Sequence, residues 1–193
     1  MNLYNLHSKP TSLDHYDHAQ DHVPSIVWKK YEDDKEELKK REALFAKDAN
    51  TAYYYASRVL EGRFPAGEAA IAKSAGRSCN YAGNVLKGRF PAGEAAIAKS
   101  AEWAGFYAVS VLDGRFPAGE AAIAADPNES LNYAEYAIEG RFPAGEAAIA
   151  ADADSSLSYA MYVLKGRFPA GEAAIAKSQE YAEEYNNFIK SLK

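Results

Sequence analysis

Apolar side chains recur along most of the chain with the spacing of an amphipathic helix. Phe90 and Ile97 form the apolar face of a short segment, PAGEAAIA, which starts at Pro91. In the stretch between Ser74 and Leu86, the small and apolar positions fall on one side of a helix drawn at about 100° per residue. These positions are Ser78, Tyr81, Ala82 and Val85. The pattern predicts a longer helix that ends near Leu86 and a shorter one that starts at Pro91.

This pair of helices repeats with a period of 26 residues. Residues 38–47 fit the same frame as a degenerate first copy, and residues 178–193 fit it as a final half-repeat. The block GRFPAGEAAIA starts at Gly62, Gly88, Gly114, Gly140 and Gly166. One unit cannot bury its apolar face alone, whereas stacked units can. The sequence therefore predicts an all-α fold, a short-repeat αα solenoid built from two-helix units.

Residues that start and stop helices stand at fixed places in each unit. The residue before each long helix can accept a hydrogen bond from a free N–H of the first turn. These residues are Asp48, Ser74, Ser100, Asp126, Asp152 and Ser178. We expect Gly88 and its equivalents to end the long helix in the left-handed conformation. Pro91 suits the first position of the short helix, and Glu94 faces the positive end of its dipole.

The repeat frame divides the chain into four parts. Residues 1–24 form a His-rich N-terminal arm, and residues 25–47 form an N-terminal capping helix or degenerate repeat. Five 26-residue repeats occupy 48–177, and a capping helix occupies 178–193. The polar character of both ends is what a solenoid needs to remain soluble.

All four histidines lie in the arm: His7, His15, His18 and His22. The last three, at i, i+3 and i+7 beside aspartates, could offer metal ligands if the segment were helical. Nothing in the sequence fixes it as a helix. We therefore favour a solvated or partner-contacting arm, and we expect neither a metal site nor a cofactor.

The charge balance bears on the type of partner. The chain has 22 Lys and Arg against 27 Asp and Glu, a net charge of −5. This mild acidity makes a nucleic-acid partner unlikely, because such proteins usually carry a basic excess. No apolar run is long enough to span a membrane. Residues 1–13 lack the apolar core of a signal peptide, and Cys79 is a lone cysteine. We expect a cytoplasmic protein, in the host cytoplasm if the chain is viral.

No pattern typical of an enzyme is present in the sequence. A nucleophile with a base, paired acids, a phosphate-binding loop and a metal motif are all missing. The glutamates of the repeat are spaced one unit apart, whereas catalytic acids converge in an asymmetric pocket. We expect no catalytic residues.

Three residue types form rows because they are identical in every repeat. Arginines recur from Arg63 and glutamates from Glu68, and we favour an Arg–Glu ladder between neighbouring units over a phosphate-binding arginine row. Tyrosines recur from Tyr55 to Tyr185. We favour buried rings with hydroxyls that reach a polar group over a stacking platform for bases. Recent duplication of the gene segment would also explain such identity.

The positions that differ between repeats carry the candidate binding site. Positions 77, 80 and 84 and their equivalents share one face of the long helix, outside the apolar stripe. Exposed aromatic residues are typical of protein-binding hot spots. The candidate partner-binding residues on this face are Tyr54, Trp103, Phe106, Tyr136, Tyr162 and Tyr181. The alternative is that neighbouring repeats or the corner loops cover some of them.

The motif YA..VL.GRFPAGEAAIA resembles short repeats of uncharacterised phage and bacterial proteins, written as YA..V..GR.P..E..I. The resemblance covers residues 42–190. It implies an α-solenoid of viral origin, and no activity that could be carried over. The unit size, and the alternation of a longer with a shorter helix, are also distantly similar to leucine-rich variant repeats, which lack the GRFP corner.

Three functions agree with these observations. The first, which we favour, is a protein-binding solenoid, with a phage-encoded inhibitor of a host defence or regulatory protein as its specific form. The second is a structural protein that self-assembles through its ends or faces. The third is a nucleic-acid or nucleotide binder that uses the Arg and Tyr rows. The sequence identifies no partner and leaves the oligomeric state open.

Overall fold

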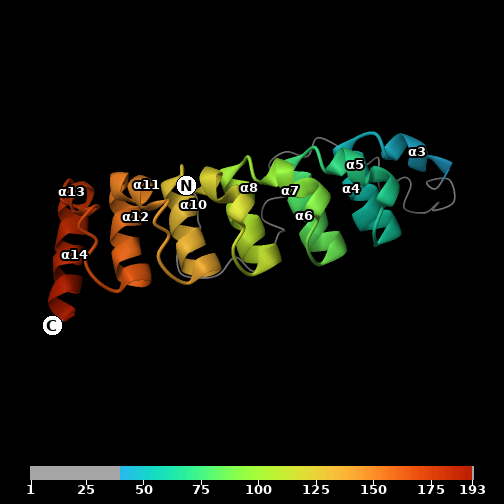
Figure 1. Ribbon diagram of the computed structural model, residues 1–193. Helices are drawn as coiled ribbons and strands as arrows, with labels where there is room; N and C mark the ends of the chain where they lie inside the picture. Colours follow the sequence, from blue (N-terminus) through green and yellow to red (C-terminus); the bar gives the residue numbers. More distant parts are fainter. Residues whose placement is uncertain (1–39, 193) are drawn as a thin grey trace. The chain divides into compact units, whose positions relative to one another are not determined.

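The computed structural model describes residues 40–192, and within this range the chain is an α-solenoid without strands. The described residues fall into two compact units, one ending at Ile97 and the other beginning at Ala98. The His-rich arm and most of the expected N-terminal capping helix lie outside the described residues. Each unit repeats the predicted pairing of a long and a short helix (Figure 1).

The first unit contains two repeats and the end of the degenerate copy that precedes them. Its long helices contact each other, as do its short helices. Each long helix begins as an α-helix and ends as a wider π-helical turn. The elements are α3 (Glu42–Phe45), α4 (Ala49–Tyr54) with η2 (Tyr55–Leu60), η3 (Pro65–Gly67), α5 (Glu68–Ile71), α6 (Ala75–Asn80) with η4 (Tyr81–Leu86), and α7 (Pro91–Ile97).

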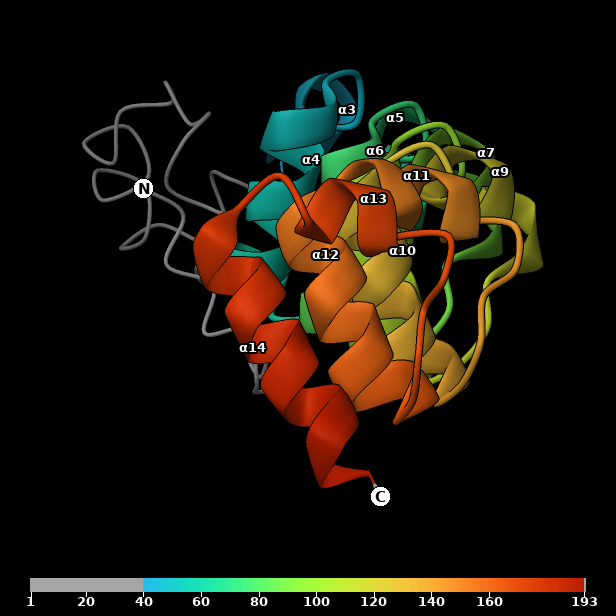
Figure 2. The same cartoon turned by 90° about the vertical axis from the view of Figure 1, so that its left-hand side faces the viewer.

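The second unit contains three repeats and the final helix. The long helices α8, α10, α12 and α14 contact one another in sequence, and the short helices lie across one end of them (Figure 2). The elements are α8 (Ala101–Tyr107) with η5 (Ala108–Leu112), η6 (Pro117–Gly119), α9 (Glu120–Ile123), α10 (Pro127–Asn132) with η7 (Tyr133–Ile138), α11 (Glu146–Ala151), α12 (Ala153–Ser158) with η8 (Tyr159–Leu164), α13 (Glu172–Ile175) and α14 (Gln179–Ser191).

The predicted N-caps are confirmed at all six long helices. The Asp126 carboxylate accepts a hydrogen bond from the Glu129 N–H at 2.9 Å, and the Ser100 hydroxyl accepts one from the Trp103 N–H at 3.3 Å. The other four caps accept from the equivalent N–H three residues on. Every long helix therefore starts with one of its free donors satisfied.

The prediction for the other end of the long helix was wrong by one residue. Lys87, with φ of 53°, takes the left-handed conformation, whereas no described glycine has a positive φ. The last turn widens into a π-helix, so the Ala82 carbonyl accepts hydrogen bonds from the N–H groups of both Lys87 and Gly88. The widened turn therefore ends before the glycine. Nothing in the structure explains glycine at Gly88, where an added Cβ would meet open space.

A second glycine of each repeat has a clear steric role. Gly145 precedes the short helix α11 and lies where this helix packs against the long helix of the same repeat. An added Cβ there would lie 2.6 Å from both Phe142 Cδ1 and Ser130 Cβ. The hydroxyl of Ser130 donates a hydrogen bond to the Ile123 carbonyl of the preceding short helix at 2.9 Å. The two helices of one repeat can therefore approach this closely only because both contact residues are small.

Candidate partner-binding surface

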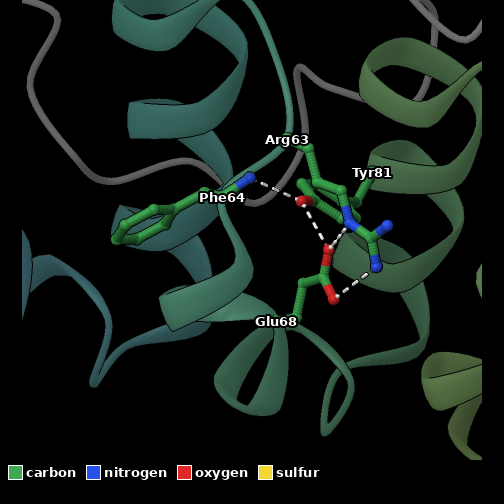
Figure 3. A network of polar contacts seen from close by, with 4 residues as sticks. All are labelled: Arg63, Phe64, Glu68 and Tyr81. Atoms are coloured by element: carbon green, nitrogen blue, oxygen red, sulfur yellow. Dashed lines mark hydrogen bonds and ion pairs between the residues drawn. The ribbon is translucent and has the colours of Figure 1, made fainter.

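A hydrogen-bond network joins the two repeats of the first unit at the corner after the first long helix (Figure 3). The Arg63 guanidinium donates two hydrogen bonds to the Glu68 carboxylate, at 2.6 and 3.1 Å. The Tyr81 hydroxyl, from the next repeat, donates to Glu68 at 3.0 Å and accepts from the Phe64 N–H at 2.8 Å. The ring of Tyr81 packs edge-on against Phe90 of its own repeat, with centroids 5.1 Å apart. One tyrosine thus connects two repeats through both of its ends.

The same network recurs through the second unit, around Tyr133, Tyr159 and Tyr185. The expected Arg–Glu pairing is confirmed, but its placement between repeats was wrong. Each ion pair joins residues five apart within one corner, and the tyrosine connects two repeats of the same unit. Because the tyrosine rings are buried, they cannot stack on bases, and that interpretation of the row is wrong.

The electrostatics of the corner agree with a structural role. Burial raises the pKa of Tyr133 to about 12, so its hydroxyl keeps the proton that it donates. The hydrogen bond from Arg63 lowers the pKa of the Glu68 carboxyl, which is therefore ionised and paired. The constant residues satisfy one another, and the candidate binding residues have to be sought among the variable ones.

The variable face is more deeply covered than the sequence indicated. Tyr54 and Phe106 are only 4% and 5% exposed, so the expectation that they lie at the surface is wrong. Trp103, Tyr136 and Tyr181 are partly exposed, and Tyr162 is 38% exposed. The predicted set therefore divides into two buried residues and four that another molecule could touch.

The next repeat and neighbouring side chains provide the cover. Arg77 lies over the rings of Tyr53 and Tyr54, at 5.3 and 5.1 Å from their centroids, and donates a hydrogen bond to Asn50 Oδ1 at 2.6 Å. Arg58 lies over Tyr54 from the same helix, at 5.1 Å. Phe106 is buried with Trp103 edge-on to it, at 6.4 Å between centroids. The contacts of Arg77 with the preceding long helix depend on stacking between helices, which a single-helix projection does not contain.

Glu129 occupies the same position in its repeat as Arg77 does in the first unit. Its carboxyl group lies over Gly105 of the preceding long helix, where an added Cβ would overlap Oε2 and lie 3.5 Å from Cδ. Burial, together with the charges of Asp126 and Glu102, raises the pKa of Glu129 to about 8. Sequence reasoning missed this group because its unusual environment is created by a glycine 24 residues away.

Glu129 is expected to make stability depend on pH between about 4.5 and 8. Over this range the folded chain keeps a proton that the unfolded chain has lost, so the free energy of unfolding falls as pH rises. Glu129→Gln, which resembles the protonated side chain, should match the wild type at pH 5 and be about 2 kcal/mol more stable at pH 9.

Urea unfolding at the two pH values, followed by circular dichroism, measures this difference. Glu139→Gln, at an exposed position of the same repeat, is the control and should change nothing at either pH. An equal gain for both variants at pH 9 would assign the effect to net charge and not to the site over Gly105.

Residues 40–192 form neither a membrane span nor a metal site. No helix within residues 40–192 combines the length and apolar character needed to cross a membrane. In the same residues, no group of three or more His, Cys, Asp or Glu side chains is arranged to hold a metal ion. The histidine arm lies outside the described residues.

The repeated helix pairs, the capped helix starts and the tyrosine connections define an α-solenoid repeat protein. No family model, no curated protein and no solved structure matches the chain.

Proposed function

We propose that this chain is a non-enzymatic, protein-binding solenoid whose binding face lies on the long helices of the second unit. One observation carries the proposal: the corners are identical in every repeat, whereas the aromatic face changes from repeat to repeat. Trp103, Tyr136, Tyr162 and Tyr181 are partly exposed on this face. Partly exposed aromatic residues on a rigid scaffold are typical of binding hot spots, because rings bury a large area at a small entropic cost.

We propose a host protein as the partner. A host defence or regulatory protein, inhibited by a phage-encoded solenoid in the cytoplasm, would agree with the resemblance of the motif to phage repeats. Self-assembly and nucleic-acid binding are the competing functions. Both are outcomes of the experiment, because a purified chain reports self-assembly by its size and nucleic-acid binding by salt-dependent capture of oligonucleotides.

The test is affinity capture of proteins from a lysate of the source organism or its host, read by mass spectrometry. We expect Trp103→Ala/Tyr162→Ala to lose a protein that the wild type retains, since two such truncations cost about 2–4 kcal/mol in a typical interface. Both side chains are partly exposed, so circular dichroism should show that the variant remains folded.

Leu192→Ala is the matched control, because it also truncates an exposed apolar side chain of the second unit but lies at the end of α14. It should retain the partner. Equal retention by both variants would place the binding site elsewhere. Concentration-dependent light scattering without a captured partner would replace the proposal with self-assembly.

A further inference from the structure

The second unit carries a strong excess of negative charge. Between residues 98 and 192 there are seven Lys and Arg against fourteen Asp and Glu. In the described part of the first unit, residues 40–97, there are nine Lys and Arg against five Asp and Glu. The two units therefore differ in the sign of their net charge, although they share the repeated block.

The unbalanced acids of the second unit are concentrated at one end of its long helices. They lie at the caps or in the first turns of α8, α10, α12 and α14, which contact one another in that order. We call them the carboxylate row: Glu102, Asp126, Asp152, Asp154 and Glu180. No ion pair joins any of them to a Lys or Arg within residues 40–192, whereas Glu120 and Glu146 are paired with arginines. Glu102 and Glu180 are exposed, and the other members of the row are half-buried, so the row brings unpaired negative charge to the surface.

The row is not required by the repeat. At the position in the repeat that Glu102, Asp154 and Glu180 share, the first unit has the neutral residues Asn50 and Gly76, and its helices form in the same way. An acid in the first turn does interact favourably with the helix dipole. At Asp154, however, burial and the nearby Asp152 carboxylate raise the pKa, so the ionised form is disfavoured there overall. The fold tolerates these charges and does not need them.

Aromatic side chains lie beside the row on the same helices. Trp103 follows Glu102 on α8, and Tyr181 follows Glu180 on α14. The charges of Asp154, Glu180, Asp152 and Glu184 raise the pKa of Tyr181, so this ring lies within the field of the row. A carboxylate next to an aromatic face is the combination that binds a guanidinium group, through an ion pair and a cation–π contact.

The row continues along the last helix. A shallow hollow on α14 is lined by Gln179, Glu180, Glu183, Glu184 and Asn187. Its carboxylates extend the negative surface past the first turn, in the same direction as the long helices. Neighbouring helices pack roughly 8–10 Å apart, so the row crosses roughly 25–30 Å from α8 to α14. An extended segment of about eight or nine residues spans this distance.

We propose that this face of the second unit binds an arginine-rich segment of a partner protein, whose guanidinium groups pair with the carboxylate row and stack on Trp103 and Tyr181. The inference rests on the proposed protein-binding function and adds the chemistry of the partner. Charge complementarity selects the occupant. A basic segment relieves the mutual repulsion of the row, whereas a neutral segment leaves that repulsion in place and an acidic segment adds to it.

The test measures binding of fluorescein-labelled nona-arginine to the full chain by fluorescence anisotropy at 50 mM salt. We expect saturable binding that weakens steeply at 300 mM salt, and no binding of nona-glutamate. The variant Glu102→Gln/Asp154→Asn, which neutralises two members of the row without touching a cap, should bind about tenfold more weakly.

The matched control is Asp113→Asn/Glu139→Gln. It makes the same chemical changes and removes the same charge from the second unit, but at the far end of the long helices. The control should change affinity by less than about twofold, because exposed charges separated by more than a Debye length, about 14 Å at 50 mM salt, are largely screened. An equal loss for both variants would show attraction to net charge only and would overturn the proposal.

The result also separates this inference from the function on which it rests. Failure of the wild type to bind nona-arginine, with a captured partner still lost in Trp103→Ala/Tyr162→Ala, overturns the arginine-rich partner and leaves the protein-binding function in place. Retention of every captured partner by that aromatic variant overturns the function itself. Salt-sensitive self-association that is lost in Glu102→Gln/Asp154→Asn would make a second copy the occupant and would overturn the proposed partner.

Discussion

Gly145→Ala is expected to destabilise the second unit by about 2–3 kcal/mol. An added methyl would overlap the Ser130 hydroxyl and lie 2.6 Å from Phe142 Cδ1, and both groups are buried. Relief requires either a separation of the two helices or the loss of the hydrogen bond from Ser130 to the Ile123 carbonyl. Urea unfolding followed by far-UV circular dichroism measures the change.

The control for this substitution lies in the same repeat. Gly140→Ala makes the same chemical change where the nearest atom, Ile138 Cγ2, would be 3.9 Å from the new methyl, and where φ is not positive. It should be neutral or stabilising by about 0.4–1 kcal/mol, because alanine restricts the unfolded chain. If Gly140→Ala were as costly as Gly145→Ala, the close approach of the two helices would not be the cause.

Tyr133→Phe is expected to cost about 2 kcal/mol, although it removes a single oxygen atom. The hydroxyl accepts from the buried Phe116 N–H at 2.8 Å and donates to Glu120 at 2.8 Å. Without it, the N–H has no partner and the connection between two repeats is lost. The ring itself keeps its edge-on contact with Phe142, so the core remains packed.

Tyr181→Phe is the matched control for the hydroxyl. No hydrogen bond joins the Tyr181 hydroxyl to another residue in the described part of the chain, so its removal should change the free energy of unfolding by less than about 0.5 kcal/mol. Thermal or urea unfolding of the two variants under identical conditions gives the comparison. Similar costs for both would mean that the tyrosine row contributes through its rings alone.

The starts of the long helices could be predicted residue by residue. A cap such as Ser100 or Asp126 acts on an N–H three residues away, so its effect is local and visible in the sequence. The ends of the long helices could not. The π-helical turn and the left-handed Lys87 depend on how the corner packs, and a rule based on isolated helices places that conformation at Gly88.

The candidate binding face was predicted in part. The helical projection correctly grouped the variable positions, but it could not show that Arg77 covers Tyr54 from the next helix or that Phe106 is buried. The sequence shows the acidic residues of the face, but only the side-by-side contact of α8, α10, α12 and α14 brings them into one row. Spacing along the chain does not report distances between helices.

The sequence by itself determined the repeat, the helix pairs, the caps and the burial of the tyrosine row, because these follow from periodicity and from contacts within a few residues. Only the tertiary structure decided which partner each constant residue takes. Arg63 and Glu68 pair within one corner, and Tyr81 reaches that pair from the next repeat. The physical reason is that identical residues in every repeat could pair either within one repeat or between neighbouring repeats. The packing distance between stacked helices selects one of these two arrangements.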